Sequence, residues 1–246
     1  MRGIVLFLFF NSFLLPSLSS IVNAVNYDKI SHLHIYDFCQ DSLGYMWIAT
    51  TRGLNRYNGY DFKQFSHNKE DEHSLENDMT SALMLDSRHR LWIGAGTGVN
   101  QYDFRNERFI RYETPKMPVY TFYEDKDGAI WIATHTSIGK INEQAFTAEM
   151  FTDPQCQFDA VSVILEDSRD KLWAGTGEGL VNINHNHWNL IPLPDDKKVN
   201  CICLDPQGIF MIGTNAGFVF FDPLTQDFLT LPAPLSSNPS LNKAYI

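Results

Sequence analysis

The stretch EDSRDKLWAGTGEGL, residues 166–180, decides the fold because it recurs along the chain. The matching segments are DSLGYMWIATTRGL at 41–54, DSRHRLWIGAGTGV at 86–99, DKDGAIWIATHTSI at 125–138 and DPQGIFMIGTNAGF at 205–218. Aligned on the tryptophan, which is Met211 in the last copy, the spacings are 45, 39, 42 and 38 residues. Periods of this length are typical of propeller blades, each built from four short strands.

Three positions form the framework of each copy: an Asp six residues before the tryptophan position, the tryptophan itself, and a Gly or Ser six residues after it. In chain order they are Asp41, Trp47 and Gly53; Asp86, Trp92 and Gly98; Asp125, Trp131 and Ser137; Asp167, Trp173 and Gly179; and Asp205, Met211 and Gly217. A small residue two after the tryptophan lets neighbouring blades approach closely, and the Gly can take a positive φ in its turn. We predict structural roles for these residues and no catalytic residue among them.

The fourth copy illustrates the strands expected in one blade. They cover 161–165, 172–176, 180–183 and 188–191, with polar turns between them. The apolar first strand is expected to be innermost and buried on both faces. One blade cannot bury its own faces, so blades stack around an axis. We therefore predict an all-β fold, a β-propeller of about five four-stranded blades plus the start of a sixth.

The two ends of the chain carry further signals. Residues 1–24 are predicted to be a signal peptide, with Arg2, an apolar core and a small-x-small site at 22–24; an uncleaved anchor is the alternative. The partial propeller then covers 25–246. The tail SLNKAYI at 240–246 resembles SLENDMT at 74–80, the lead-in to the second copy. An open stack exposes an unpaired edge, so we expect this chain to be an incomplete propeller, a fragment or a truncated gene product of a longer protein.

Composition restricts the partners and the compartment. The formal net charge of −10 argues against a nucleic-acid-binding face. The predicted signal peptide favours an exported protein. Cys39 and Cys203 occupy equivalent first-strand positions and are expected to be buried small hydrophobes. Cys201 and Cys203 should point to the same face, where they are poorly placed to bridge, and Cys156 lies in a loop; the disulfide state stays open.

Motifs for chemistry are weak. No phosphate-binding loop or nucleophile elbow is present in the sequence. The pair His185 and His187 lacks further ligands at metal-binding spacing, and the turn aspartates supply too few oxygens for a calcium loop. We predict no cofactor and no metal. A pair of carboxylates of the glycosidase kind stays open, because sequence does not give their separation.

Candidate ligand-binding residues lie in loops expected to surround one mouth of the channel, namely the turns between second and third strands and the connectors into each first strand. Their side chains differ between copies while the framework repeats. The candidates are Arg52, Thr97, His135, Glu178 and Asn215 in the turns and Lys116 in a connector, with Thr136, His32, His34, His67 and Tyr120 nearby. Aromatic and polar groups suit sugars, and Arg52 or Lys116 suits a carboxylate or sulfate. The alternative is solvated loop variation.

The unit D-x-x-G-x-[LI]-W-[IA]-[GA]-T-x-x-G-[LIV], followed by [YI]-[ND], resembles the two-component regulator propeller repeat. That repeat is found in the periplasmic sensor half of hybrid two-component system proteins (histidine kinase and response regulator) of Bacteroidetes. The resemblance covers about residues 26–246, in five copies that keep the same register. Met211 in place of Trp, Ser137 in place of Gly and Ala95 in place of Thr depart from the pattern.

The resemblance implies a larger protein. In this family two seven-bladed propellers precede an immunoglobulin-like module, a membrane span, a histidine kinase, a receiver and a DNA-binding domain. It implies an oligosaccharide ligand, a site on the mouth or between domains, a homodimer and an inner-membrane anchor. Kinase activity would lie outside this sequence. The resulting hypothesis is a non-enzymatic sensor module; the alternatives are an exported propeller polysaccharide lyase or glycosidase and a protein-interaction scaffold.

Overall fold

The computed structural model describes residues 29–114, 117–184 and 187–229. Three sequence-based predictions lie outside those residues: the signal peptide at 1–24, the lead-in to a sixth blade at 240–246, and Lys116. The described chain forms five antiparallel sheets of four strands each, and within every sheet the strands follow one another in chain order. The predicted all-β propeller with five four-stranded blades is therefore confirmed.

The strands of the five blades are as follows. Blade 1 contains β1 (Ile35–Gln40), β2 (Met46–Thr50), β3 (Gly53–Tyr57) and β4 (Phe62–Phe65). Blade 2 contains β5 (Thr80–Leu85), β6 (Leu91–Ala95), β7 (Gly98–Asp103) and β8 (Arg108–Tyr112). Blade 3 contains β9 (Thr121–Glu124), β10 (Ile130–Ala133), β11 (Ile138–Asn142) and β12 (Thr147–Phe151). Blade 4 contains β13 (Val163–Glu166), β14 (Leu172–Gly175), β15 (Gly179–Asn184) and β16 (His187–Pro192). Blade 5 contains β17 (Val199–Leu204), β18 (Phe210–Thr214), β19 (Gly217–Asp222) and β20 (Asp227–Leu229), after a short 3-10 turn at Pro194–Asp196.

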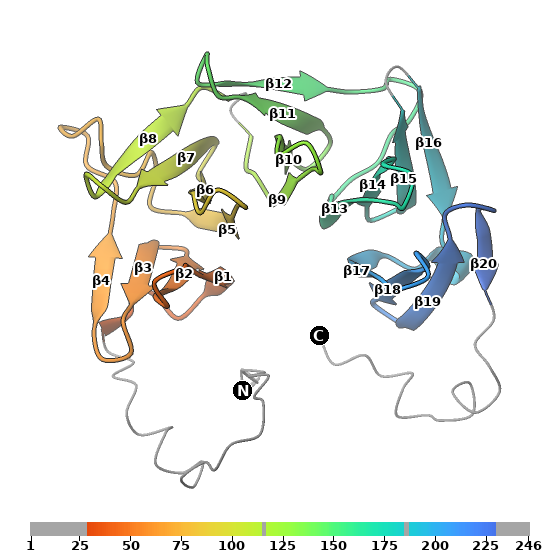
Figure 1. Ribbon diagram of the computed structural model, residues 1–246, viewed down its shortest axis with the longest axis horizontal. Helices are drawn as coiled ribbons and strands as arrows, with labels where there is room; N and C mark the ends of the chain where they lie inside the picture. Colours follow the sequence, from red (N-terminus) through yellow and green to blue (C-terminus); the bar gives the residue numbers. More distant parts are fainter. Residues whose placement is uncertain (1–28, 115–116, 185–186, 230–246) are drawn as a thin grey trace, which may run out of the picture.

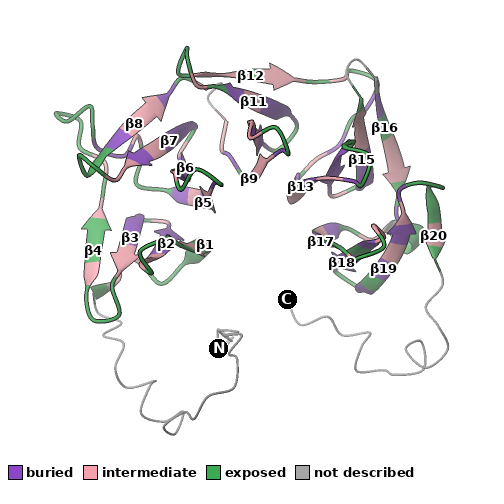
Figure 2. Ribbon diagram, in the orientation of Figure 1, coloured by how far each residue is buried: buried purple, intermediate pink, exposed green. Residues whose placement is uncertain are grey.

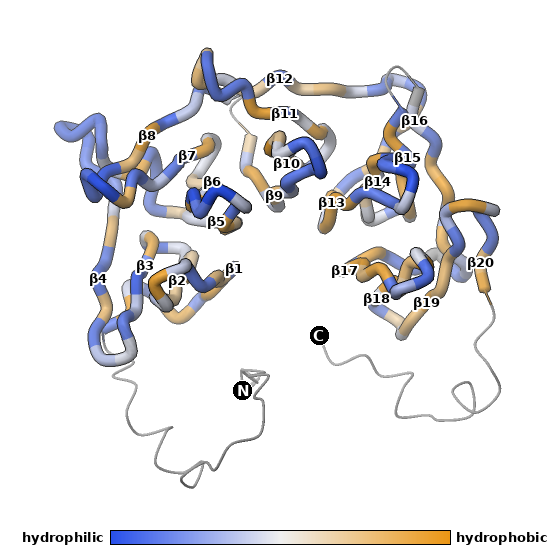
Figure 3. Tube along the Cα trace, viewed as in Figure 1, coloured by the Kyte–Doolittle hydropathy of each residue, from blue (hydrophilic) through white to orange (hydrophobic). Residues whose placement is uncertain are grey.

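The blades are arranged in an arc around a centre, with β1, β5, β9, β13 and β17 innermost (Figure 1). The described parts of blades 1 and 5 face each other across the open side of the arc. Apolar residues concentrate on the strands, and polar residues occupy many of the turns between them (Figure 3). This alternation is what a stack of sheets requires, because each sheet buries its faces against its neighbours.

The Asp of each copy organises the turn between the first and second strands. Asp41 Oδ1 accepts hydrogen bonds from the backbone N–H groups of Leu43 and Tyr45, and Asp41 Oδ2 accepts one from Trp47 Nε1 at 2.8 Å. The same indole bond is 2.9, 2.8 and 3.1 Å long in blades 2, 3 and 4. In blade 5, the Met211 side chain has no N–H group, and among the described residues the Asp205 carboxylate accepts hydrogen bonds only from the backbone N–H groups of Gln207 and Ile209. Asp and Trp are therefore joined by a side-chain hydrogen bond in blades 1 to 4.

Glycine and threonine shape the opposite end of blades 1, 4 and 5. Thr176 Oγ1 donates to the carbonyl of Gly179 at 2.9 Å, and Thr50 and Gly53 make the same bond in blade 1. Gly179 has a φ of 144°, so a side chain there would be strained. A Cβ on Gly175 would lie 2.4 Å from Val199 Cγ1 of the next blade. The small residue after the tryptophan therefore sets the distance between neighbouring blades.

Each blade packs its tryptophan-bearing face, called here the forward face, against the backward face of the following blade. Trp47, Trp92 and Trp173 are completely buried in this way. Trp47 lies in a cluster with Tyr102 of blade 2, and Trp173 in one with Phe210 and Phe221 of blade 5. The apolar core is thus a series of layers between blades.

Two predictions about burial are wrong at the ends of the arc. The innermost strands were expected to be buried on both faces, but β1 and β17 expose about half of their residues (Figure 2). Cys203 is exposed because no described blade covers the forward face of blade 5. Cys39 shares the forward face of blade 1 with Trp47, packs at the edge of the cluster with blade 2 and is only half-buried. Cys201 is also exposed, and it pairs with Gly213 while Cys203 pairs with Met211, so the two cysteines share a face as predicted.

All four cysteines are free thiols in the structure, and Cys156 is buried. No helix in the part of the chain that the structure describes is long and apolar enough to cross a membrane.

Candidate functional site

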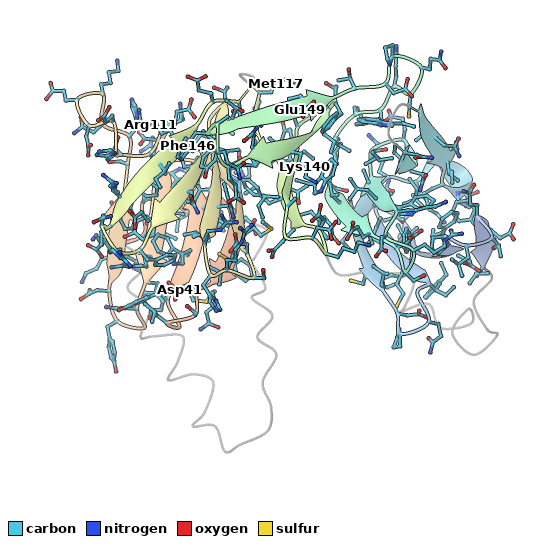
Figure 4. The ribbon with its side chains drawn as sticks, turned by 45° about the horizontal axis from the view of Figure 1, so that its top comes forward. Asp41, Arg111, Met117, Lys140, Phe146 and Glu149 are labelled. Atoms are coloured by element: carbon cyan, nitrogen blue, oxygen red, sulfur yellow. The ribbon has the colours of Figure 1, made fainter. Side chains whose placement is uncertain are left out.

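The turns between second and third strands and the connectors into each first strand lie at one end of the sheets, here called the loop face. The Asp turns lie at the other end, as seen for Asp41 in Figure 4. The described candidates are all exposed at the loop face: Arg52, Thr97, His135, Glu178 and Asn215.

Two of these candidates converge on the connector between blades 3 and 4. His135 Nδ1 accepts a hydrogen bond from the backbone N–H of Ala160 at 3.0 Å. Glu178 Oε2 accepts one from the backbone N–H of Asp159, also at 3.0 Å. The Tyr120 ring lies 6.3 Å from the His135 ring in an edge-on arrangement. An imidazole and a carboxylate from two different blades therefore hold one short piece of chain, and a phenol lies beside the imidazole.

The connector itself has two unusual features. Asp159 Oδ1 is buried and has no hydrogen-bond partner, whereas buried polar atoms are nearly always paired. Ala160 has a φ of 49°, a left-handed conformation that is uncommon for a residue with a Cβ and stores strain. Strained backbone and unpaired polar atoms concentrate at functional sites. We define Tyr120, His135, Asp159 and Glu178 as the loop-face cluster.

Asp159 was missed in the sequence, although a signal for it exists. The register that pairs Ala82 with Gly94 in blade 2 and Val163 with Gly175 in blade 4 makes Asp78 the equivalent of Asp159. Asp78 Oδ1 accepts a hydrogen bond from the backbone of His67 at 2.6 Å, but Asp159 Oδ1 has no such donor. An acid just before an innermost strand is therefore visible in the sequence, but its missing partner is a tertiary property.

The other candidates do not join the cluster. The guanidinium of Arg52, on blade 1, makes no hydrogen bond or ion pair with any residue that the structure describes. Asn215 Oδ1, on blade 5, accepts from the backbone of Lys198 at 3.0 Å, and the Thr97 carbonyl accepts from Thr114 Oγ1 at 3.1 Å. Among the connector residues, His32 Nδ1 lies 2.6 Å from Thr51 Oγ1 and His67 Nδ1 lies 2.8 Å from the Leu75 carbonyl. Several of these side chains thus hold loops in place.

The loop-face cluster offers hydrogen-bond acceptors and aromatic edges rather than a metal centre. Among the described residues there is no group of three or more His, Cys, Asp or Glu side chains placed to hold a metal ion. Two carboxylates, an imidazole and a phenol in an exposed loop can accept and donate hydrogen bonds to the hydroxyl groups of a polar ligand.

Known proteins resemble this chain in sequence and in fold. The family model described as two component regulator propeller matches residues 29–52 and 115–136. Histidine kinase P4 of Formosa agariphila is 29% identical over 204 residues, which cover 72% of this chain and 14% of that protein. The chain therefore spans about a seventh of the length of this curated relative.

Solved structures match over most of the chain. The extracellular domain of the hybrid two component system BT3049 from B. thetaiotaomicron superposes with a TM-score of 0.73 at 20% identity, over 83% of this chain and 31% of that one. Virginiamycin B lyase from Staphylococcus aureus superposes with a TM-score of 0.64 at 13% identity, over 82% of this chain and 71% of that one. At these identities the likeness shows the fold alone. Together with the five in-register copies, these findings show that the chain is similar to two component regulator propeller proteins in its repeats and in its fold.

Proposed function

We propose that this chain is the ligand-sensing, extracytoplasmic propeller module of a hybrid two-component signalling protein, and that it recognises an oligosaccharide. The single observation that carries the proposal is the match to two component regulator propeller repeats at residues 29–52 and 115–136, whose sequence pattern recurs in all five blades. A relative described as a histidine kinase and a structural neighbour described as an extracellular domain support it. The kinase that would receive the signal lies outside this sequence.

The loop-face cluster supports a hydroxyl-rich ligand. Glu178 and Asp159 present carboxylate oxygens, and His135 and Tyr120 add an imidazole and a phenol within the same connector region. Such groups orient sugar hydroxyls by hydrogen bonding, and an aromatic ring face packs against the apolar face of a sugar ring. Arg52 lies on a different blade and would serve as a separate contact, for an acidic substituent.

Two measurements on the purified chain test this proposal. Isothermal titration calorimetry against a panel of neutral and acidic oligosaccharides is expected to find binding, and product analysis after long incubation is expected to find the sugar unchanged. Turnover would instead favour an exported lyase or glycosidase, the alternative raised by the fold it shares with virginiamycin B lyase.

The signalling part of the proposal is tested in cells. Replacing His135 and Glu178 with Ala in the chromosomal gene should abolish the transcriptional response to the sugar that binds in vitro. A response that survives loss of binding would contradict a sensor role for this module.

A further inference from the structure

A groove separates blades 3 and 4 at the end of the sheets opposite the loop face. Its volume is about 540 Å³, within the range of small-molecule sites. The forward face of blade 3 contributes Trp131 and Phe151, and the backward face of blade 4 contributes Leu172 and Ile183. One aromatic wall thus faces one aliphatic wall.

The groove exists because this junction is filled less completely than the others. At the junction of blades 4 and 5, Trp173 meets Phe210 and Phe221, with ring centroids 5.5 and 5.6 Å away. Leu172 and Ile183 are the equivalents of those two phenylalanines in blade 4. Trp131 consequently makes its ring contact with Phe151 of its own blade, at 5.9 Å. It is the one framework tryptophan that stays half-buried.

A second difference removes the outer cover from Trp131. Two residues before the tryptophan, blade 1 has Tyr45 and blade 2 has Arg90. The Arg90 guanidinium lies 5.1 Å from the Trp92 ring and forms ion pairs with Glu143 of the next blade. Blade 3 has Ala129 at this position, which supplies only a methyl group. Its tryptophan is covered instead by Lys140, whose Nζ lies 5.0 Å from the ring and whose strand pairs with that of Glu149 (Figure 4).

The rim of the groove is polar and close to neutral. Lys126 forms an ion pair with Asp170 across the junction, and its backbone N–H donates to Glu166 Oε2 at 3.0 Å. Asp127 and Lys171 are exposed on the two facing turns. The rim therefore carries three carboxylates and two ammonium groups, a slightly negative balance that favours an uncharged ligand over an anionic one. Carboxylates accept and ammonium groups donate hydrogen bonds to hydroxyls.

We propose that the groove is a binding subsite for one or two rings of a neutral oligosaccharide. The sugar's apolar face packs on the exposed part of Trp131 and on Phe151, and its hydroxyls contact Asp127, Lys171 and Asn184 at the rim. The proposal rests on the oligosaccharide-sensing function proposed above. The groove is a different site from the loop-face cluster, because the two lie at opposite ends of the same pair of blades.

The test fills the groove with a residue that the chain already uses elsewhere. Ile183→Phe copies Phe221 of the tightly packed junction between blades 4 and 5. Wild-type and variant chains are titrated by calorimetry with short malto-, cello-, xylo- and laminari-oligosaccharides, and with oligogalacturonate as the anionic probe. The variant should keep or raise the melting temperature and lose affinity by about tenfold or more, equal to about 1.4 kcal/mol.

Two further variants separate the groove from the loop face. Lys171→Ala with Asn184→Ala changes only rim side chains, and should weaken binding even if Ile183→Phe fails to fold. His135→Ala with Glu178→Gln changes only the loop face. In that background, Lys171→Ala with Asn184→Ala should lower the remaining affinity by the same factor as in wild type, because the two sites lie at opposite ends of the blades. Normal affinity in both groove variants with loss in the loop-face variant overturns the groove and leaves the sensor proposal standing. Binding of oligogalacturonate alone overturns the neutral ligand, and no binding to wild type overturns both proposals.

Discussion

The forward faces of blades 4 and 5 occupy the same place in the repeat and have opposite environments. In blade 4, Leu165, Trp173 and Leu180 are buried under blade 5. The equivalent residues of blade 5 are Cys203, Met211 and Phe218, and all three are exposed. The strands, turns and pairing are the same in both sheets. The comparison shows that the local structure of a blade does not determine whether its forward face is buried. The presence of the next blade determines it.

Loss of a large side chain should have the largest effect where the face is covered. We expect Trp173→Ala to lower the free energy of unfolding by about 3–5 kcal/mol, because it opens a cavity between blades. Met211→Ala, at a side chain that is 38% exposed, should change it by less than about 1 kcal/mol. Urea denaturation followed by circular dichroism measures both. Equal losses would mean that blade 5 is also covered in solution.

The turn aspartates allow a finer comparison of the same two blades. Asp167→Ala removes the acceptor of the buried Trp173 indole as well as two backbone bonds. Asp205→Ala removes only the two backbone bonds. We expect Asp167→Ala to be the more destabilising by about 1–3 kcal/mol, the usual cost of leaving a buried donor unpaired. Thermal unfolding of the two variants, with Asp205→Ala as the control, decides this.

An ion pair at the junction of blades 2 and 3 makes a smaller, pH-dependent contribution to the free energy of unfolding. The hydrogen bonds from Arg90 lower the pKa of Glu143, and burial, which acts the other way, is the weaker influence. A carboxyl whose pKa is lowered on folding stabilises the fold above its unfolded pKa of about 4.3, and the stabilisation disappears as the pH falls through the lower folded value.

Melting temperatures of wild type and Glu143→Gln, measured between about pH 6 and pH 3, test that linkage. The two proteins should differ most at the upper end of this range and converge at the lower end, because protonation removes the charge that the variant lacks. A constant difference across the range would show that the Arg90–Glu143 pair is not the origin.

The rates at which the four cysteines react with an alkylating reagent should show which blade faces are exposed, without any substitution in the chain. Cys201 and Cys203 are exposed on the uncovered face, whereas Cys156 is buried and burial raises its pKa. Burial, followed by the charges of Asp37 and Asp41, raises the pKa of Cys39 to about 12. Brief iodoacetamide treatment and peptide mass spectrometry should therefore find Cys201 and Cys203 alkylated first. Early labelling of Cys156 would indicate that blade 4 opens locally.

The parts of the site that depend on chain order were predictable. Loops between second and third strands were expected at one end of the sheets, and His135 and Glu178 lie there. Their convergence on Asp159 and Ala160 was not predictable, since His135 belongs to blade 3 and reaches the connector of blade 4. The groove was also missed, although Ala129 and Ile183 depart visibly from the larger residues of other copies. Their small size matters only after two blades are placed face to face.

By itself the sequence determined the number of blades, their strand order and the role of each framework Asp and Trp. These features depend on contacts within one repeat, such as the bond that joins Asp41 to Trp47 six residues later. Only the tertiary structure decided which framework faces became core, which stayed open and which left a groove. The reason is physical: burial and cavity volume are set jointly by two surfaces, and each repeat specifies only its own.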